Sequence, residues 1–120
     1  DEAMLLKLVE RVLRRAGFRV VTAATSPEAL EAFREDPEAI GAVLIDAGVP
    51  PSGAAEVLRS MLALRTGFGV VVSSGGSPSE EIQELLADCG GRFLGKPFDP
   101  EALISIVLAM GRPIGHPSGG

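Results

Sequence analysis

Apolar residues follow two alternating patterns along the chain, one typical of amphipathic helices and the other of short buried strands. The opening segment keeps its apolar residues at helical spacing, with the charged residues mostly on the other side, until Gly17 ends it. The residues that share this stripe are Leu5, Leu8, Val9, Val12 and Leu13. The same spacing predicts further helices over about 26–36, around 57–62, over about 77–89 and over about 99–110.

Short apolar runs between these segments are typical of strands that are buried on both faces. They lie at 18–23, 42–46, 69–72 and 92–95. Because helices and strands alternate, the sequence predicts an α/β fold with a parallel sheet and helices on both of its faces. One folded domain is expected over 1–110, followed by a flexible tail rich in Gly and Pro over 111–120.

Two of the helix starts are predicted from capping patterns. Ser26 followed by Pro27 is typical of an N-cap with proline at the first helical position. The run from Ser77 to Glu80 has the form of a capping box, again with a proline at the first helical position. We therefore expect Ser26 and Ser77 to be the N-caps of these two helices.

Three polar side chains stand at the ends of predicted strands. Asp46 ends one apolar run, Ser74 follows the next, and Lys96 follows the last. Because the carboxyl ends of parallel strands meet at one edge of a sheet, we expect these side chains to lie together. A carboxylate oxygen can attack phosphorus, while a cation and hydrogen-bond donors hold the phosphoryl oxygens. Mg²⁺ normally assists this chemistry, with Asp1, or Glu2 in reserve, as an additional ligand.

Composition narrows the classes of function. The formal net charge is −5 and no basic stripe is present, which argues against a nucleic-acid surface. The apolar runs are too short to span a bilayer and no leader pattern marks secretion, so a soluble cytoplasmic domain is expected. The single Cys89 excludes an internal disulfide, and His116 stands in the Gly- and Pro-rich tail, where we expect a solvated residue.

Four short motifs occur in a fixed order, one before the first helix and three at strand ends. They are Asp1-Glu2, Leu44-Ile45-Asp46 with Pro50 and Gly53, Val72-Ser73-Ser74-Gly75, and Phe93-Leu94-Gly95-Lys96-Pro97-Phe98. In this combination the chain resembles the receiver domain of two-component response regulators, over Asp1 to about Met110. The resemblance implies a flavodoxin-like, doubly wound α/β/α fold. The Ser-Ser-Gly form at 73–75 and the Lys-Pro-Phe-Asp-Pro-Glu run at 96–101 are most similar to those of receivers attached to hybrid histidine kinases.

The resemblance implies a phosphoryl acceptor and a metal site. Asp46 corresponds to the phosphorylated aspartate, which receives the group from a histidine kinase or a phosphotransfer domain. Asp1, Asp46 and the backbone carbonyl of Gly48 correspond to the ligands of Mg²⁺, with Glu2 in reserve. Such a domain catalyses its own phosphoryl transfer and dephosphorylation, and it acts as a signalling module rather than a metabolic enzyme.

The resemblance also implies a switch around the acceptor. Ser74, with Gly75 beside it, corresponds to the hydroxyl residue that moves to hold the phosphoryl group. Lys96 corresponds to the lysine that contacts this group, and Pro97 is expected to follow a cis peptide bond. Phe93 stands at the aromatic position that responds to the movement of Ser74.

One expected strand has no counterpart in this sequence. Receivers have an apolar strand before the position of Asp1, in the middle of the sheet between the strands expected here at 18–23 and 42–46. Without it we expect a gap in backbone hydrogen bonding between those two strands. The N-terminal strand is therefore expected to lie before residue 1 or to come from another chain.

The last helix predicts a contact surface. Ile104 and Leu108 fall off its core stripe, so both are expected to remain partly exposed. In the resembled family this helix and its neighbours often form a homodimer or partner face.

Two alternative functions remain open at this point. A pseudo-receiver would keep the fold without phosphorylation and act as a protein-binding module. A small hydrolase or phosphatase would use Asp46 as a transient nucleophile, but Gly48 stands where a second catalytic acid would be needed.

Overall fold

The computed structural model describes residues 2–110, apart from the side chains of residues 2, 3 and 110. Every segment predicted as helix or strand is present. The helices are α1 (Glu2–Arg15), α2 (Ser26–Glu35), a 3-10 helix η1 (Pro37–Ala39), α3 (Ala54–Leu64), α4 (Glu80–Cys89) and α5 (Pro100–Met110). The strands are β1 (Val20–Thr22), β2 (Ala42–Asp46), β3 (Gly69–Ser74) and β4 (Arg92–Gly95). Asp1, His116 and the rest of the predicted tail lie outside the described residues.

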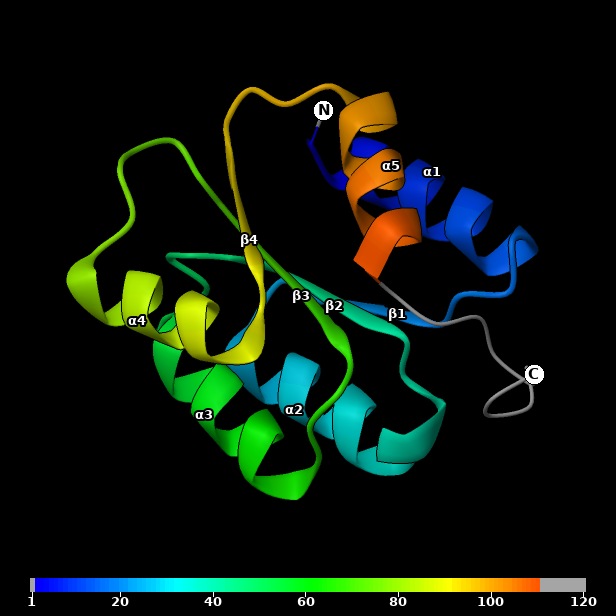
Figure 1. The fold of residues 1–120 in the computed structure, drawn as a ribbon. Helices are drawn as coiled ribbons and strands as arrows, with labels where there is room; N and C mark the ends of the chain where they lie inside the picture. The colour runs from blue at the N-terminus through cyan, green and yellow to red at the C-terminus, as the bar shows by residue number, and fades with distance from the viewer. Residues whose placement is uncertain (1, 111–120) are drawn as a thin grey trace.

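The four strands form one parallel sheet in the order β1-β2-β3-β4. Helices α1 and α5 cover one face of this sheet, and α2, α3 and α4 cover the other (Figure 1). The prediction of an α/β fold with a parallel sheet between two helical layers is therefore confirmed. In such a fold all strands present their carboxyl ends at the same edge of the sheet.

The expected gap between the first two strands was wrong. β1 pairs directly with β2, with Val20 opposite Ala42 and Thr22 opposite Leu44. Backbone N–H and C=O groups that are buried without partners cost free energy, and direct pairing of the two strands supplies those partners. The loop before β2 extends this contact, since the Gly41 and Ala42 amides donate to the Arg19 carbonyl at 2.8 and 3.3 Å.

Two apolar cores hold the helices on the sheet. The α2–α4 core includes Phe33, Leu58 and Met61, all fully buried, and the rings of Phe33 and Phe68 lie 4.9 Å apart. The α1–α5 core on the other face includes Val9, Leu13, Phe18, Leu103 and Val107. Val, Leu and Ile supply most of both cores, as expected for a chain with few aromatic residues.

Two predicted N-caps were wrong by one or two positions. Thr25, not Ser26, caps α2, because its side chain accepts a hydrogen bond from the Glu28 amide at 3.3 Å. Ser26 is instead buried, and its hydroxyl donates to the Pro50 carbonyl at 3.2 Å. Ser79, not Ser77, caps α4 by accepting from the Ile82 amide at 3.2 Å. In each pair both residues have a suitable side chain, and in α2 the contact with Pro50 engages the Ser26 hydroxyl away from the helix end.

Arg65, just after α3, connects this helix with the segment that contains η1. Its Nη1 donates to the carbonyls of Pro37 at 2.6 Å and Ile40 at 2.7 Å. The guanidinium also lies 6.0 Å from the centre of the Phe68 ring. Because only 19% of its side chain is exposed, Arg65 makes these two hydrogen bonds in a part-buried position.

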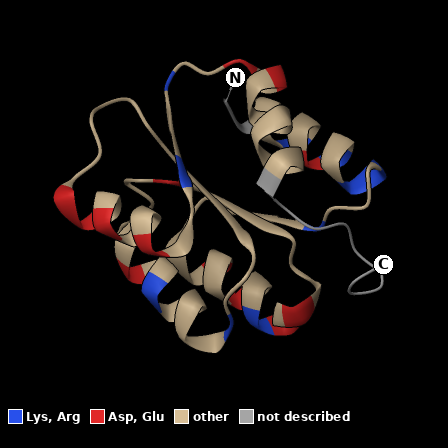
Figure 2. Cartoon of the chain, viewed as in Figure 1, with Lys and Arg blue, Asp and Glu red and all other residues tan. Residues whose placement is uncertain are grey.

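Charge is distributed unevenly over the helices. Acidic residues predominate on α2 and α4, whereas basic residues predominate on α1 (Figure 2). The basic residues of α1 are Lys7, Arg11, Arg14 and Arg15. Within residues 2–110, no helix combines the length and the apolar character needed to cross a membrane.

Candidate functional site

The carboxyl ends of β2, β3 and β4 bring the three predicted polar residues to one edge of the sheet. Asp46 is the last residue of β2, Ser74 is the last residue of β3, and Lys96 directly follows β4. The register places Asp46 opposite Ser73 and Ser74 opposite Gly95. The Lys96 amide donates to the Ser74 carbonyl at 2.8 Å, which fixes the start of the loop that carries the lysine.

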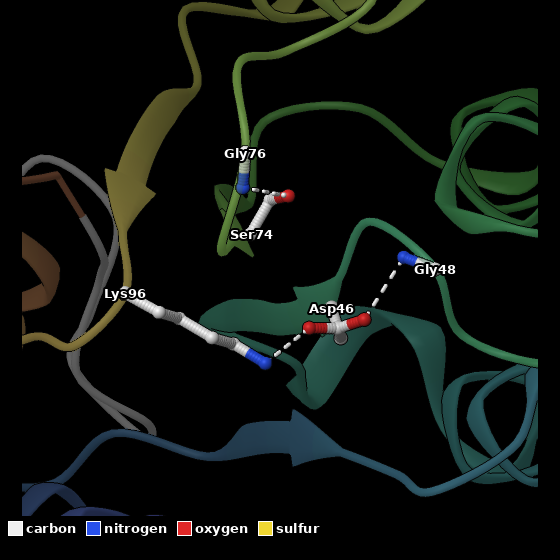
Figure 3. Close-up of polar contacts among 5 residues, drawn as sticks. All are labelled: Asp46, Gly48, Ser74, Gly76 and Lys96. Atoms are coloured by element: carbon white, nitrogen blue, oxygen red, sulfur yellow. Dashed lines mark hydrogen bonds and ion pairs between the residues drawn. The ribbon is translucent and has the colours of Figure 1, made fainter.

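Asp46 is held by two donors on opposite oxygens. The Lys96 ammonium forms an ion pair and hydrogen bond with Oδ1, and the Gly48 amide donates to Oδ2 at 2.9 Å (Figure 3). The Asp46 side chain is 40% exposed and that of Lys96 is 24% exposed. The carboxylate is therefore fixed in direction yet open to an incoming reactant.

Ser74 lies at the same edge but makes a local contact. Its Oγ accepts a hydrogen bond from the Gly76 amide at 3.1 Å (Figure 3). A hydroxyl that accepts one hydrogen bond still has a proton to donate. Gly75, between these two residues, is exposed, so the turn presents backbone rather than bulky side chains to the site.

Phe93 lies within β4, before Lys96, and Pro97 directly follows Lys96. Phe93 is half-buried in β4 and packs against the α2–α4 core. The Lys96–Pro97 peptide bond is cis, as the resemblance implied. Phe93 thus connects the apolar interior with the strand that leads to Lys96.

The residues expected to complete a metal site are described only in part. Gly48 lies beside Asp46, as its hydrogen bond to Oδ2 shows. Asp1 lies outside the described residues, and Glu2 is described only as the first backbone position of α1. Among the described residues, no group of three or more His, Cys, Asp or Glu side chains is placed to hold a metal ion.

The two residues expected at an interface differ in exposure. Leu108 is 46% exposed, whereas Ile104 is half-buried and packs against the α1–α5 core. The outward surface of α5 therefore includes Leu108 more fully than Ile104.

A cleft of about 500 Å³ opens in front of Asp46. Lys96, Ser73 and Thr22 line it, as do Lys7 and Glu28, which the sequence pattern did not place at this edge. Lys7 lies in the first half of α1 and Glu28 in the first turn of α2. Because helices that follow strands in this fold begin at the carboxyl edge of the sheet, the start of α2 after β1 was the signal that could have found Glu28. No strand precedes α1 among the described residues, so Lys7 had no such signal.

Known proteins similar in sequence are transcriptional regulators. The chain is 29% identical to the transcriptional regulatory protein KdpE of Mycobacterium tuberculosis (strain ATCC 25618 / H37Rv) over 109 residues, or 91% of this chain and 47% of that protein. The chain thus spans about half the length of the curated relatives it matches.

Several solved structures with the same fold are receiver domains. The BeF3-activated DrrB receiver domain is 29% identical, with a TM-score of 0.66 over 92% of this chain and 89% of that one. A receiver domain from Clostridium thermocellum gives a TM-score of 0.74 at 21% identity, over 92% of this chain and 86% of that one. The sheet formed by residues 2–110 has one strand fewer than is usual in this flavodoxin-like fold.

The family comparison agrees with the fold. The model of the response regulator receiver domain matches residues 1–108, which is nearly the whole chain. A receiver implies a cognate histidine kinase as its partner, and receivers typically bind Mg²⁺. This chain therefore belongs to the response regulator receiver domain family and is a receiver of two-component signal transduction.

Proposed function

We propose that Asp46 accepts a phosphoryl group from the phosphohistidine of a histidine kinase or phosphotransfer domain. The contact between the Asp46 carboxylate and the Lys96 ammonium at the mouth of a cleft carries this proposal. The cleft leaves room for a donor group, and the two hydrogen bonds to Asp46 orient its oxygens. A carboxylate that is both oriented and accessible is suited to nucleophilic attack.

The transfer balances without a further reactant. An Asp46 oxygen attacks phosphorus, and the new O–P bond forms as the P–N bond of phosphohistidine breaks. The imidazole nitrogen keeps the electron pair of the broken bond. The ring leaves as neutral imidazole because its other nitrogen already carries a proton. The product on Asp46 is an acyl phosphate.

Lys96 supplies fixed positive charge to this step. During transfer, negative charge is spread over the oxygens of the phosphoryl group. The ammonium already lies against the Asp46 carboxylate, so it needs little rearrangement to contact a phosphoryl oxygen on that side chain. The Gly48 amide provides a second donor on the other side of the acceptor.

The described residues offer Mg²⁺ the oxygen donors it prefers. The Asp46 carboxylate and the Gly48 backbone carbonyl would hold the ion, and proteins commonly bind Mg²⁺ through one or two carboxylates together with phosphate oxygens and water. When bound, Mg²⁺ supplies positive charge to the phosphoryl oxygens. Asp1, with Glu2 in reserve, remains the proposed additional carboxylate.

Ser74 and Phe93 would convert phosphorylation into a change of surface. In this proposal the Ser74 hydroxyl leaves the Gly76 amide and donates to a phosphoryl oxygen on Asp46. Phe93 packs at the edge of the α2–α4 core and can adopt a new rotamer when Ser74 moves. The signal then reaches the surface formed by α4, β4 and α5.

Treatment with phosphoramidate, with and without Mg²⁺, tests the acceptor role. We expect one Mg²⁺-dependent phosphoryl adduct by intact mass, and none in Asp46→Asn. Borohydride reduction, which converts an acyl phosphate to homoserine, should locate the adduct at position 46. A protein that gives no adduct but binds its partner unchanged would be a pseudo-receiver, and that result would refute the proposal.

A further inference from the structure

Both lysines of this sequence lie at the acceptor cleft. Every other basic residue is an arginine, yet Lys7 and Lys96 both line the cleft that holds Asp46. They come from different elements, Lys7 from α1 and Lys96 from the loop after β4. Lysine presents a compact point charge to a phosphoryl group, whereas arginine favours planar, two-pronged contacts. This placement suggests a shared role in recognising a phosphoryl group.

Among the described residues that line the cleft, formal charges are balanced before a donor arrives. The charged residues in this described set are Lys7, Lys96, Asp46 and Glu28. Lys96 is already paired with Asp46, and Glu28 accepts a hydrogen bond from the Ala24 amide at 3.3 Å. A dianionic donor therefore approaches two carboxylates, those of Asp46 and Glu28, while Lys96 already contacts Asp46. Among the described residues that line the cleft, Lys7 is the other cation.

We propose that Lys7 binds the phosphoryl group of the incoming donor at the mouth of the acceptor cleft. This inference rests on the proposed acceptor role of Asp46 and adds a donor-binding residue to it. Lys7 is exposed, so its contribution is a screened attraction between charges rather than a buried ion pair. For one charge pair near water we expect an effect of about five-fold on the rate of transfer.

Arg11 provides a matched control one turn further along α1. It is exposed and carries the same charge, and it lines a neighbouring apolar groove of about 830 Å³ with Lys7, Met4 and Leu8. Arg11 is not among the described residues that line the acceptor cleft. Replacing Arg11 therefore removes the same charge from the same helix without removing it from the cleft.

Initial rates with acetyl phosphate, a dianion at neutral pH, test this role in the full chain at constant Mg²⁺. In this reaction the Asp46 O–P bond forms as the P–O bond of the donor breaks, and acetate leaves with the electron pair. We expect Lys7→Gln to lower the rate constant per donor concentration about five-fold at low ionic strength. The deficit should shrink as salt is added, because salt screens the attraction. Lys7→Arg should restore most of the rate, and Arg11→Gln should match the wild type.

Three outcomes would overturn the role of Lys7. They are an unchanged rate in Lys7→Gln, an equal loss in Arg11→Gln, and a deficit that does not depend on salt. Urea unfolding of each variant checks that the fold is retained. If the wild type itself gives no adduct, the acceptor role of Asp46 fails, and the inference falls with it. A normal adduct in both wild type and Lys7→Gln, at equal rates, refutes only the inference.

Discussion

Lys96 and Asp46, 50 positions apart in the sequence, meet across the carboxyl end of β3. Asp46 ends β2 and Lys96 follows β4, so the ion pair spans the outer ends of three adjacent strands. Its geometry depends on the register of both strand pairs, Asp46 with Ser73 and Ser74 with Gly95. The chemistry of the site is therefore tied to correct assembly of the central sheet.

Loss of the ammonium should slow phosphoryl transfer. We expect Lys96→Gln to lower the rate of phosphorylation by phosphoramidate about 100-fold, because a fixed cation next to the developing charge is lost. Lys96→Arg should recover part of this rate, since the charge remains but its shape differs. Quenched-flow sampling with intact mass measures both variants. A rate for Lys96→Gln within a factor of two of wild type would contradict the role assigned to Lys96.

Ser74→Ala should separate phosphorylation from its structural response. Activation with BeF3⁻ and Mg²⁺ is expected to shift amide NMR signals both near Asp46 and around Phe93 in the wild type. In Ser74→Ala the signals near Asp46 should still shift, whereas those around Phe93 should not. This variant lacks the hydroxyl that would donate a hydrogen bond to the phosphoryl oxygen. Ser77→Ala, at an exposed position beyond the turn, is the control. A full response in Ser74→Ala would show that Phe93 is coupled by another route.

Arg65 should contribute more to stability than an exposed ion pair. Arg65→Met removes donors to the carbonyls of Pro37 and Ile40, so we expect the free energy of unfolding to fall by about 2 kcal/mol. Arg59→Met loses the ion pair with Glu81, in which both side chains are about half exposed, and should cost less than about 1 kcal/mol. Urea denaturation of both variants measures the difference. Equal losses would mean that the carbonyls near Arg65 find other partners.

Leu108 is the sharper probe of the proposed interface on α5. Leu108→Asp should reduce any self-association that follows phosphorylation, because it places a charge on an exposed apolar position. Ile104→Asp is a poorer test, since Ile104 packs against the α1–α5 core and its replacement also affects folding. Ala102→Asp adds the same charge at another exposed position of α5. Sedimentation velocity with and without phosphodonor compares them, and unchanged association of Leu108→Asp would exclude this face.

Sequence reasoning predicted the elements of the fold and the meeting of Asp46 with Lys96. Both follow from local patterns together with one general rule, that parallel strands end at the same edge. Lateral placement of the strands was less predictable. Nothing in the run around Val20 indicates that it pairs directly with the run around Ala42, because neighbours in a sheet are chosen by the whole assembly.

Details that depend on competing partners were also missed. Thr25 and Ser26 are both suitable caps, and only the contact of Ser26 with Pro50 shows why Thr25 takes that role. Lys7 belongs to the charged residues of the first helix, which were predicted only to lie mostly opposite its apolar stripe. Its proximity to Asp46 follows from how α1 sits on the sheet, which helical periodicity does not specify.

The lysines also matter for chemical handling of the protein. Within this sequence, side-chain primary amines occur only at Lys7 and Lys96, beside Asp46. Amine-reactive dyes, crosslinkers and amine-coupled sensor chips would therefore modify the acceptor cleft before any other side chain. Cys89, half-buried at the end of α4 on the other helical layer, offers a thiol for labelling that leaves both amines intact.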